Sequence, residues 1–213
     1  KESLICGWNL ILKELKKNKT NFFPLDSEHF SIFSLLGQNS VKKIDKIFIT
    51  ASGGPFLNHT YSKLTKVKIN EALNHPNWKM GKKISIDSST MMNKLFEVIE
   101  AKKIFNIPYK KIKILIHPKS YVHALIKFNN GITKILLHEP NMKIPIHNSL
   151  YHFSDKELKT KQINFKILNR LNFQSVDYKK FPLLKLLSNL PKNDSLFETV
   201  LVTINDFFVS IYL

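Results

Sequence analysis

Three acidic side chains in two short segments could together bind a divalent cation. Asp26 and Glu28 flank Ser27, and an extended backbone would turn both carboxylates to the same side of the chain. Glu97 stands three residues after Lys94, on a shared face of a predicted helix. Carboxylates with neighbouring hydroxyl and amide groups suit a hard cation such as Mg²⁺ or Mn²⁺. The alternative is structural: Asp26 would be a turn or cap residue, and Glu97 would only pair with Lys94.

A second set of residues could hold a phosphate group. Ser52-Gly53-Gly54 follows a predicted buried strand and could direct a hydroxyl group and backbone N–H groups at an anion. Ser88 and Ser89 are expected at the N-terminus of a helix, where unpaired N–H groups attract anions, and Lys94 could add a positive charge. The segment at Ser52 is more often a plain turn. The glycine motifs of phosphate loops and dinucleotide-binding folds are absent from the sequence.

Three histidines allow further interpretations. His75 shares a predicted loop with Trp78 and Met80, and such a loop could close over a ligand and exclude water. The alternative is that Trp78 only anchors the loop to the core. His117 ends a predicted strand and could face a cleft or simply cap the strand. His29 is expected to orient or pack against neighbours rather than to bind a ligand.

The pattern along the chain predicts an α+β fold. The expected helices cover residues 2–17, 29–36, 90–101 and 195–213. The expected strands cover residues 21–25, 47–51, 84–87 and 113–116, with a hairpin at 121–128 and 132–137 around an Asn-Gly turn. We therefore predict a mixed-sheet domain flanked by helices at 1–150, a linker at 151–180 and a partial helical C-terminal domain at 181–213.

The composition limits the class of protein. With 213 residues, 43% of them hydrophobic, the chain can bury a core. No run approaches the 18 or so apolar residues of a membrane span. The single cysteine, Cys6, excludes a disulfide framework and is expected to be inert in a helix core. The first residue is Lys1 rather than Met, which favours a piece of a longer protein or a processed product.

The charge also bears on function. The formal net charge is +17, yet Arg170 is the only arginine among the 33 basic residues. Sequence-specific base recognition depends on the arginine fork, so we favour lysine-rich solvated surfaces over nucleic-acid binding. A face that binds a polyanion is the alternative, and the same positive field would steer a phosphorylated small substrate.

The order and spacing of several segments resemble one enzyme family over roughly residues 1–150, namely 1-deoxy-D-xylulose 5-phosphate (DXP) reductoisomerase. The similar segments are Lys1-Glu2-Ser3, residues 24–29, 52–56, 75–84 and 87–94, Glu97, and residues 116–118 and 139–142. Residues 181–182 and 205–206 weakly resemble the C-terminal helical domain of the family.

The resemblance implies a role for individual residues. The implied metal ligands are Asp26, Glu28 and Glu97. The implied catalytic residues are Lys1, Ser27 and His117. The implied substrate-binding residues are Ser27, Ser52, His75, Ser88, Asn93 and Lys94, most of them around the phosphate. Met80, in a mobile loop, and Met142 are the implied neighbours of the NADPH cofactor.

The resemblance also implies a reaction and its setting. DXP would be rearranged with Mg²⁺ or Mn²⁺ and reduced by NADPH to 2-C-methyl-D-erythritol 4-phosphate, in non-mevalonate isoprenoid synthesis. The expected assembly is a homodimer with no nucleic-acid or membrane partner, in the bacterial cytoplasm or a plastid. Because the family carries an NADPH-binding domain before the Lys-Glu-Ser segment, that domain is expected to be missing here.

The sequence departs from the family pattern at three positions where glycine is expected: Ala51, Leu95 and His138. A bulky Leu95 beside two implied site residues can point away from the site if the segment is helical. Two alternative functions stay open: a remnant that binds metal and sugar phosphate without turnover, and a basic nucleic-acid-binding protein.

Overall fold

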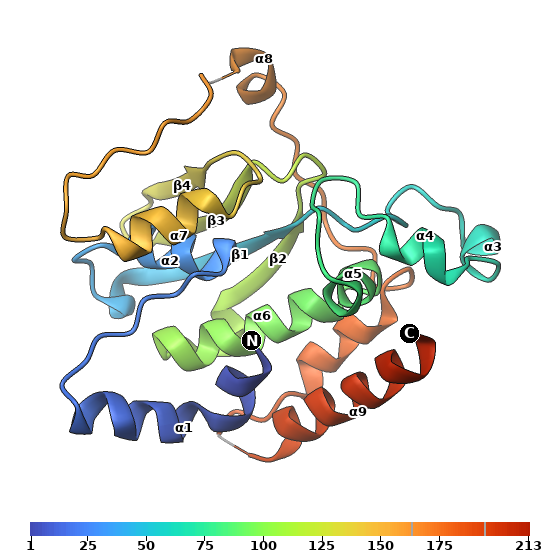
Figure 1. Ribbon diagram of the computed structural model, residues 1–213, viewed down its shortest axis with the longest axis horizontal. Helices are drawn as coiled ribbons and strands as arrows, with labels where there is room; N and C mark the ends of the chain where they lie inside the picture. The colour runs from blue at the N-terminus through green and yellow to red at the C-terminus, as the bar shows by residue number, and fades with distance from the viewer. Residues whose placement is uncertain (163, 194) are drawn as a thin grey trace.

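A four-stranded sheet forms the centre of the molecule (Figure 1). The computed structural model describes residues 1–162, 164–193 and 195–213. The strands are β1 (Ile44–Ala51), β2 (Ile112–Ile116), β3 (Val122–Phe128) and β4 (Thr133–Leu137), in the order β2-β1-β3-β4. β1 pairs in parallel with β2 and antiparallel with β3, and β3 pairs antiparallel with β4. The predicted α+β class with a mixed sheet is confirmed.

Helices surround this sheet. The α-helices are α1 (Glu2–Lys17), α2 (Ser27–Leu36), α3 (Tyr61–Leu64), α4 (Ile69–Leu73), α5 (Lys82–Ser89), α6 (Met92–Phe105), α7 (Lys143–Leu150), α8 (Phe165–Leu168) and α9 (Phe197–Tyr212). Within the described residues, the 3₁₀ helices are η1 (Val41–Lys43), η2 (Tyr109–Lys111) and η3 (Pro182–Asn189). α2 packs on β3 and β4, α6 packs on β1 and β2, and α1 contacts both α6 and α9 (Figure 1).

The strand sequences explain why the sheet is central. β1 and β3 are rich in branched apolar residues, and their side chains are buried along most of their length. The hairpin between β3 and β4 turns at Gly131, whose φ of +87° is a conformation that glycine adopts without strain. The hairpin predicted from the Asn-Gly pair is therefore confirmed.

One continuous cluster of buried apolar side chains joins the sheet to both ends of the chain. It includes Ile32 from α2, Ile47 from β1 and Phe96 from α6. It also includes Leu184 from η3 and Leu201 from α9. Residues 181–213 thus pack on the same core as the sheet, and the division into domains at 150 and 180 stays a prediction.

Two predicted strands are wrong. Residues 21–25 form neither helix nor strand, because they lead into α2 without a pairing partner. Residues 84–87 belong to α5, where Lys83 and Asp87 form an ion pair one turn apart. A four-residue alternation of apolar and polar residues is too short to distinguish a strand from one turn of a helix.

The predicted helix start at Ser88 or Ser89 is also wrong. Both serines lie in the last turn of α5, and α6 begins only at Met92. Met91 separates the two helices with a left-handed φ of +64°. Ser88 therefore sits at the C-terminal end of a helix, and the argument from a helix N-terminus does not apply to it.

Two further observations concern exposure. Cys6 is exposed on α1, so the prediction that it lies in a helix core is wrong; it falls on the outer face of an amphipathic helix whose buried residues are Ile5 and Trp8. Within the part of the chain that the structure describes, no helix has both the length and the apolar character needed to cross a bilayer.

Leu184, which is fully buried, tests whether the C-terminal segment shares the core of the sheet. We expect Leu184→Ala to lower the free energy of unfolding by roughly 2–5 kcal/mol, because it leaves a cavity. Urea unfolding followed by circular dichroism should still show one transition. The control is Leu183→Ala, at a position 37% exposed, with an expected change within about 0.5 kcal/mol. A separate early transition that only Leu184→Ala shifts would contradict a shared core.

Candidate functional site

A cavity of about 340 Å³ lies at the end of the sheet where β1 finishes and the antiparallel β3 begins. Its walls come from the N-terminal ends of α2 and α6, the loop before α5, the last turn of α5, and the start of α7. Twelve of the thirteen predicted site residues line it, namely Lys1, Asp26, Ser27, Glu28, Ser52, His75, Met80, Ser88, Asn93, Lys94, Glu97 and Met142. The exception is His117.

The three predicted metal ligands converge. One carboxylate oxygen from each of Asp26, Glu28 and Glu97 lies within 4.8 Å of the others. The predicted reason was partly wrong, because only Asp26 is extended, with φ −60° and ψ 135° at the N-cap of α2. Ser27 and Glu28 already belong to the first turn of this helix. The convergence therefore results from the packing of α2 against α6, not from one extended segment.

Two lysines neutralise much of this negative charge. The ammonium group of Lys1 lies 3.0 Å from Asp26 Oδ2 and 3.4 Å from Glu97 Oε1. It also donates a 2.6 Å hydrogen bond to Asn93 Oδ1, and Asn93 in turn donates to Glu97 Oε1 at 2.5 Å. Asn93 and Glu97 thus lie one turn apart on the same face of α6.

Lys94 lies on the other side of the same cluster. Its ammonium group is 2.7 Å from Glu28 Oε1 and 2.6 Å from Glu97 Oε2, and it donates to the backbone oxygen of Thr50 at 2.6 Å. Only about one twentieth of the Lys94 residue is exposed. This lysine therefore contacts the carboxylates directly, and a phosphate contact requires its ammonium group to leave one of these three acceptors.

Burial and charge shift the pKa values of this cluster in opposite directions. Burial, together with the charge of Glu28, raises the pKa of Glu97 to about 7, although Lys94 and Lys1 oppose this. Burial also acts to raise the pKa of Asp26, but Lys1 and His29 outweigh it and hold that pKa below its ordinary value. A hard divalent cation would stabilise the charged form of all three carboxylates, so this donor set fits Mg²⁺ or Mn²⁺.

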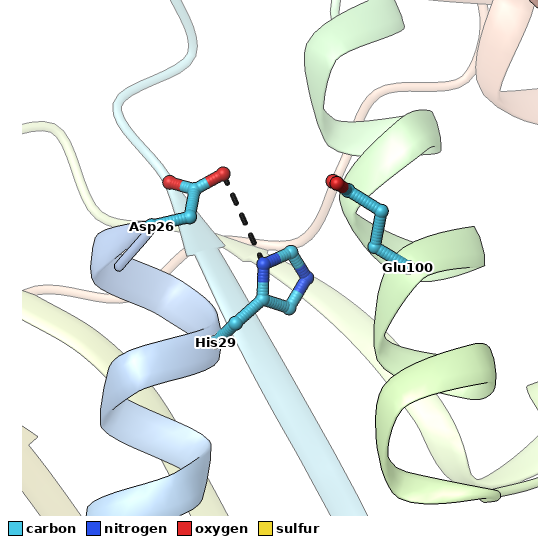
Figure 2. A group of neighbouring side chains, drawn as sticks. All are labelled: Asp26, His29 and Glu100. Carbon is cyan, nitrogen blue, oxygen red and sulfur yellow. Dashed lines mark ion pairs between the residues drawn. The ribbon is translucent and has the colours of Figure 1, made fainter. Parts of the chain in front are cut away.

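His29 lies between two carboxylates from different helices, as Figure 2 shows. Its Nδ1 is 3.9 Å from Asp26 Oδ2, and its Nε2 bonds to the backbone oxygen of Glu97 at 2.9 Å. Because a carbonyl oxygen only accepts, Nε2 carries a proton. On the far side is Glu100, which is 1% exposed and whose pKa burial raises to about 7. His29, Asp26 and Glu100 each offer one ligand atom within 4.8 Å of the others, so the prediction that His29 is not a ligand stays a prediction. Glu100 was missed because nothing in the local sequence pattern marked it as a site residue.

The hydroxyl group of Ser52 is arranged to donate to an anion. His75 Nδ1 accepts from the backbone N–H groups of Asn77 and Trp78, so the proton of the neutral ring is on Nε2. That Nε2 lies 3.0 Å from Ser52 Oγ, which also accepts from the N–H of Gly54 at 3.0 Å. Both lone pairs of Ser52 Oγ are therefore occupied, and its own proton is free to donate into the cavity.

The ring of His75 is uncharged at neutral pH. Burial, assisted by the nearby positive charge of Lys94, lowers the pKa of His75 to about 4. A neutral ring keeps the two donor and acceptor roles fixed. His75 therefore acts here as an orienting group for Ser52, not as a positive charge for an anion.

Gly54 brings Ser52 and Ser88 to the same wall. Its φ is +67°, and a Cβ atom at this position would lie 2.8 Å from the backbone oxygen of Ser88 and 3.2 Å from Ser89 Cα. Only glycine permits this approach of the loop to the last turn of α5. A close backbone contact, not a helix N-terminus, thus brings together the segments that carry Ser52 and Ser88.

The predicted loop is held at three points. Besides the His75 contact, Asn77 Nδ2 donates to the backbone oxygen of Pro118 at 2.6 Å and to Ser120 Oγ at 2.8 Å. Trp78 packs edge-on against His123, with 6.2 Å between ring centroids. The indole therefore faces the cavity, and its packing partner is a buried histidine of β3.

His117 does not reach this cavity, which departs from its implied catalytic position. It is 1% exposed, its Nδ1 bonds to the backbone oxygen of Asn172 at 2.9 Å, and its ring packs on Phe173. Its backbone N–H donates to Ala51, directly before Ser52. Burial lowers its pKa. The ring is turned toward the segment after α8 because that segment supplies its hydrogen-bond acceptor.

The fold and the cavity define an α+β domain with a carboxylate-lined pocket at the end of a mixed sheet. Two family models match the sequence of this chain. The model of the 1-deoxy-D-xylulose 5-phosphate reductoisomerase C-terminal domain matches residues 22–105, and that of the DXP reductoisomerase C-terminal domain matches residues 137–213. The chain belongs to the 1-deoxy-D-xylulose 5-phosphate reductoisomerase family.

Individual relatives and solved structures agree with this placement. The reductoisomerase of Pelagibacter ubique is 60% identical in sequence, and the match covers 100% of this chain and 55% of the relative. The reductoisomerase of Wolbachia pipientis wMel is 45% identical, and the match covers 87% of this chain and 48% of the relative. The Zymomonas mobilis enzyme in complex with NADPH superimposes with a TM-score of 0.89 at 33% identity, over 100% of this chain and 55% of that one. A DOX-P reductoisomerase in complex with NADPH, fosmidomycin and magnesium superimposes with a TM-score of 0.90 at 34% sequence identity, and the match covers 99% of this chain and 54% of that one. The chain thus spans about half the length of the relatives it matches.

Gly54 allows a test of whether its close contact with the last turn of α5 assembles the part of the cavity that carries Ser52 and Ser88. Gly54→Ala should lower the free energy of unfolding by more than the roughly 1–2 kcal/mol of left-handed strain, and weaken inorganic phosphate binding measured by calorimetry. Gly131→Ala is the matched control, because Gly131 also has a positive φ but no atom within 4 Å of the added Cβ. Equal losses of stability in the two variants, with phosphate affinity unchanged, would disprove the contact's role.

His123 predicts a pH dependence of stability. Burial, with the neighbouring His138, lowers the pKa of His123 to about 3 in the folded chain, below an unfolded value near 6.5. The unfolded chain therefore binds a proton that the folded chain does not between these values, so stability falls as pH falls through this window. Between pH 7.5 and pH 5 this amounts to about 2 kcal/mol. In His123→Gln, the free energy of unfolding measured in urea should decrease by about 2 kcal/mol less between pH 7.5 and pH 5 than in the unsubstituted chain. The same pH dependence in both would show that His123 is not the group responsible.

Proposed function

We propose that this chain forms the metal- and substrate-binding part of a 1-deoxy-D-xylulose 5-phosphate reductoisomerase. The reaction is the rearrangement of DXP and its reduction with NADPH to 2-C-methyl-D-erythritol 4-phosphate, in non-mevalonate isoprenoid synthesis. The observation that carries the proposal is the convergence of three carboxylates and an anion-directed serine hydroxyl in one cavity.

The carboxylate end binds the cation and the reacting end of the substrate. Asp26, Glu28 and Glu97 are the proposed ligands of Mg²⁺ or Mn²⁺. Such a cation, when bound, supplies Lewis-acid polarisation of the substrate carbonyl oxygen. Ser27 Oγ donates to Glu28 Oε2 at 2.8 Å and, with Lys1, can contact the substrate's hydroxyl and carbonyl oxygens.

The opposite end holds the phosphate group. Ser52 and Ser88 supply hydroxyl donors, and His75 orients Ser52. Asn93 and Lys94 line the same cavity and contact Glu97 and Glu28, so their donors are proposed to bind the phosphate once they leave these carboxylates. Phosphate binding far from the reacting carbon fixes the substrate and provides binding energy that the chemical step uses.

The remaining residues serve the cofactor and the cavity wall. Met80 and Met142 line the cavity and are the proposed neighbours of NADPH, which supplies the hydride when bound. Closure of residues 75–81 over the substrate would exclude water from it. The implied catalytic role of His117 stays a proposal: its backbone N–H bonds to Ala51, directly before Ser52, while its side chain bonds to Asn172.

The proposed setting is a homodimer in the bacterial cytoplasm, with no nucleic-acid or membrane partner. β4 is an edge strand that exposes Ile135 and Leu137, which supports association with a second copy. The named relatives with a stated source are bacterial, so a plastid is the less favoured location.

Binding of Mn²⁺ tests the proposal at its centre. Titration of the chain, followed by electron paramagnetic resonance, should show one site whose affinity increases when DXP is present. Asp26→Asn should weaken that site more than about 100-fold, since losing even an outer partner of a ligand typically costs 10–100-fold.

The matched control is Asp45→Asn, which removes an exposed carboxylate that pairs with Lys127 outside the cavity. It should leave Mn²⁺ affinity within about twofold, the scatter expected of an exposed pair. A folded chain that binds no Mn²⁺ would refute the proposal. Mn²⁺ binding without any effect of DXP would favour a remnant that retains the metal site alone.

A further inference from the structure

A group of charged side chains outside the cavity joins three helices through one lysine. Lys83, on α5, places its ammonium group 2.6 Å from Glu2 Oε1 on α1. The same nitrogen is 2.9 Å from Asp87 Oδ2, one turn along α5, and 3.1 Å from Asp206 Oδ1 on α9. We call Lys83, Glu2, Asp87 and Asp206 the Lys83 hub. α5 is thus tied to α1 on one side and to α9 on the other.

A second contact strengthens the link to α9. The other carboxylate oxygen of Asp87, Oδ1, accepts a 2.8 Å hydrogen bond from Asn205 Nδ2. The Asp87 side chain is 4% exposed, unlike the carboxylates of Glu2 and Asp206 at 34% and 46%. Isolated surface ion pairs contribute little, but a buried carboxylate held by an ammonium and an amide group is costly to leave unpaired.

The hub lies directly behind residues that line the cavity. Asp87 precedes Ser88, and Glu2 follows Lys1, yet no residue of the hub is among those that line the cavity. α9 likewise contributes none of the lining residues. The loop of residues 75–81 runs straight into α5, so the hub also fixes the end of that loop.

We propose that Lys83 is a positioning residue for the phosphate end of the cavity, and that α9 acts on the substrate through it. The inference rests on the proposed function for the identity of the substrate. α5 has only eight residues, between Gly81 and the left-handed Met91, so helix propensity alone does little to fix its position. The hub holds it between α1 and α9, in the position where both Ser88 and Ser52 line the cavity.

The charges explain why Lys83 matters more than its exposure suggests. Three carboxylates from three helices meet at one ammonium group. Without that ammonium, Glu2 and Asp206 would repel Asp87 from both sides, and α5 would move away from its neighbours. Burial opposes the charged form of Lys83, but its three carboxylates raise the pKa above the ordinary lysine value.

The test compares Lys83→Met with Lys82→Met, which removes an exposed positive charge from the preceding position of the same helix. Calorimetry with Mn²⁺ present should show DXP affinity about tenfold lower in Lys83→Met, within the range for outer positioning partners. Mn²⁺ affinity should change by less than about twofold, because its ligands are on α2 and α6. Lys82→Met should change neither, and Lys83→Arg should restore DXP affinity.

Amide hydrogen exchange in α5 supplies a readout that does not depend on the substrate. Exchange should be faster in Lys83→Met than in Lys82→Met, and Asp206→Asn should have a smaller effect in the same direction. If Lys83→Met fails to fold, Asp206→Asn tests the inference instead, because it removes only the ion pair between Lys83 and α9.

Two results would overturn the inference. One is a folded Lys83→Met with unchanged DXP affinity and unchanged α5 exchange. The other is an equal loss of Mn²⁺ and DXP affinity with a lower melting temperature, which indicates a merely structural role. If the unsubstituted chain binds Mn²⁺ but not DXP, the proposed function fails, and α5 exchange still decides for or against the hub.

Discussion

The convergence of three carboxylates in one cavity, with Glu97 fully buried, is the constraint on which the rest of the site depends. Like charges this close repel one another, and their removal from water adds to that cost. Two ammonium groups compensate: Lys1 contacts Asp26 and Glu97, and Lys94 contacts Glu97 and Glu28. Glu97 is the least exposed of the three carboxylates and contacts both lysines. Its ionisation therefore depends most on a nearby cation.

The proposed phosphate-binding end of the cavity is subject to a different electrostatic constraint. It must attract an anion only a few side chains away from a group of carboxylates, and it does so mainly with neutral donors. The hydroxyl of Ser52 has its lone pairs occupied by Gly54 and by His75, and His75 is itself uncharged. Neutral donors fixed by the backbone keep their direction without adding further buried charge.

The departures from the family pattern are compatible with this arrangement. Leu95 is fully buried in the core on α6, and its side chain points away from the cavity, as a helical segment allows. His138 stacks on His123 at 3.7 Å between ring centroids, and burial lowers the pKa of both. The extra ring therefore packs against the cavity wall as a neutral aromatic group and adds no charge there.

The sequence alone determined the fold class, the hairpin and the longer helices, because periodicity and turn motifs are local properties, and its resemblance to the family supplied the candidate site residues. Only the tertiary structure decided how Asp26 and Glu28 meet Glu97, since helix packing sets that distance. Only the tertiary structure showed that Ser88 lies at the C-terminal end of a helix and that His117 does not line the cavity. Gly54 and Lys83 show the reason: their roles depend on atoms more than thirty residues away or on another helix, which no local pattern encodes.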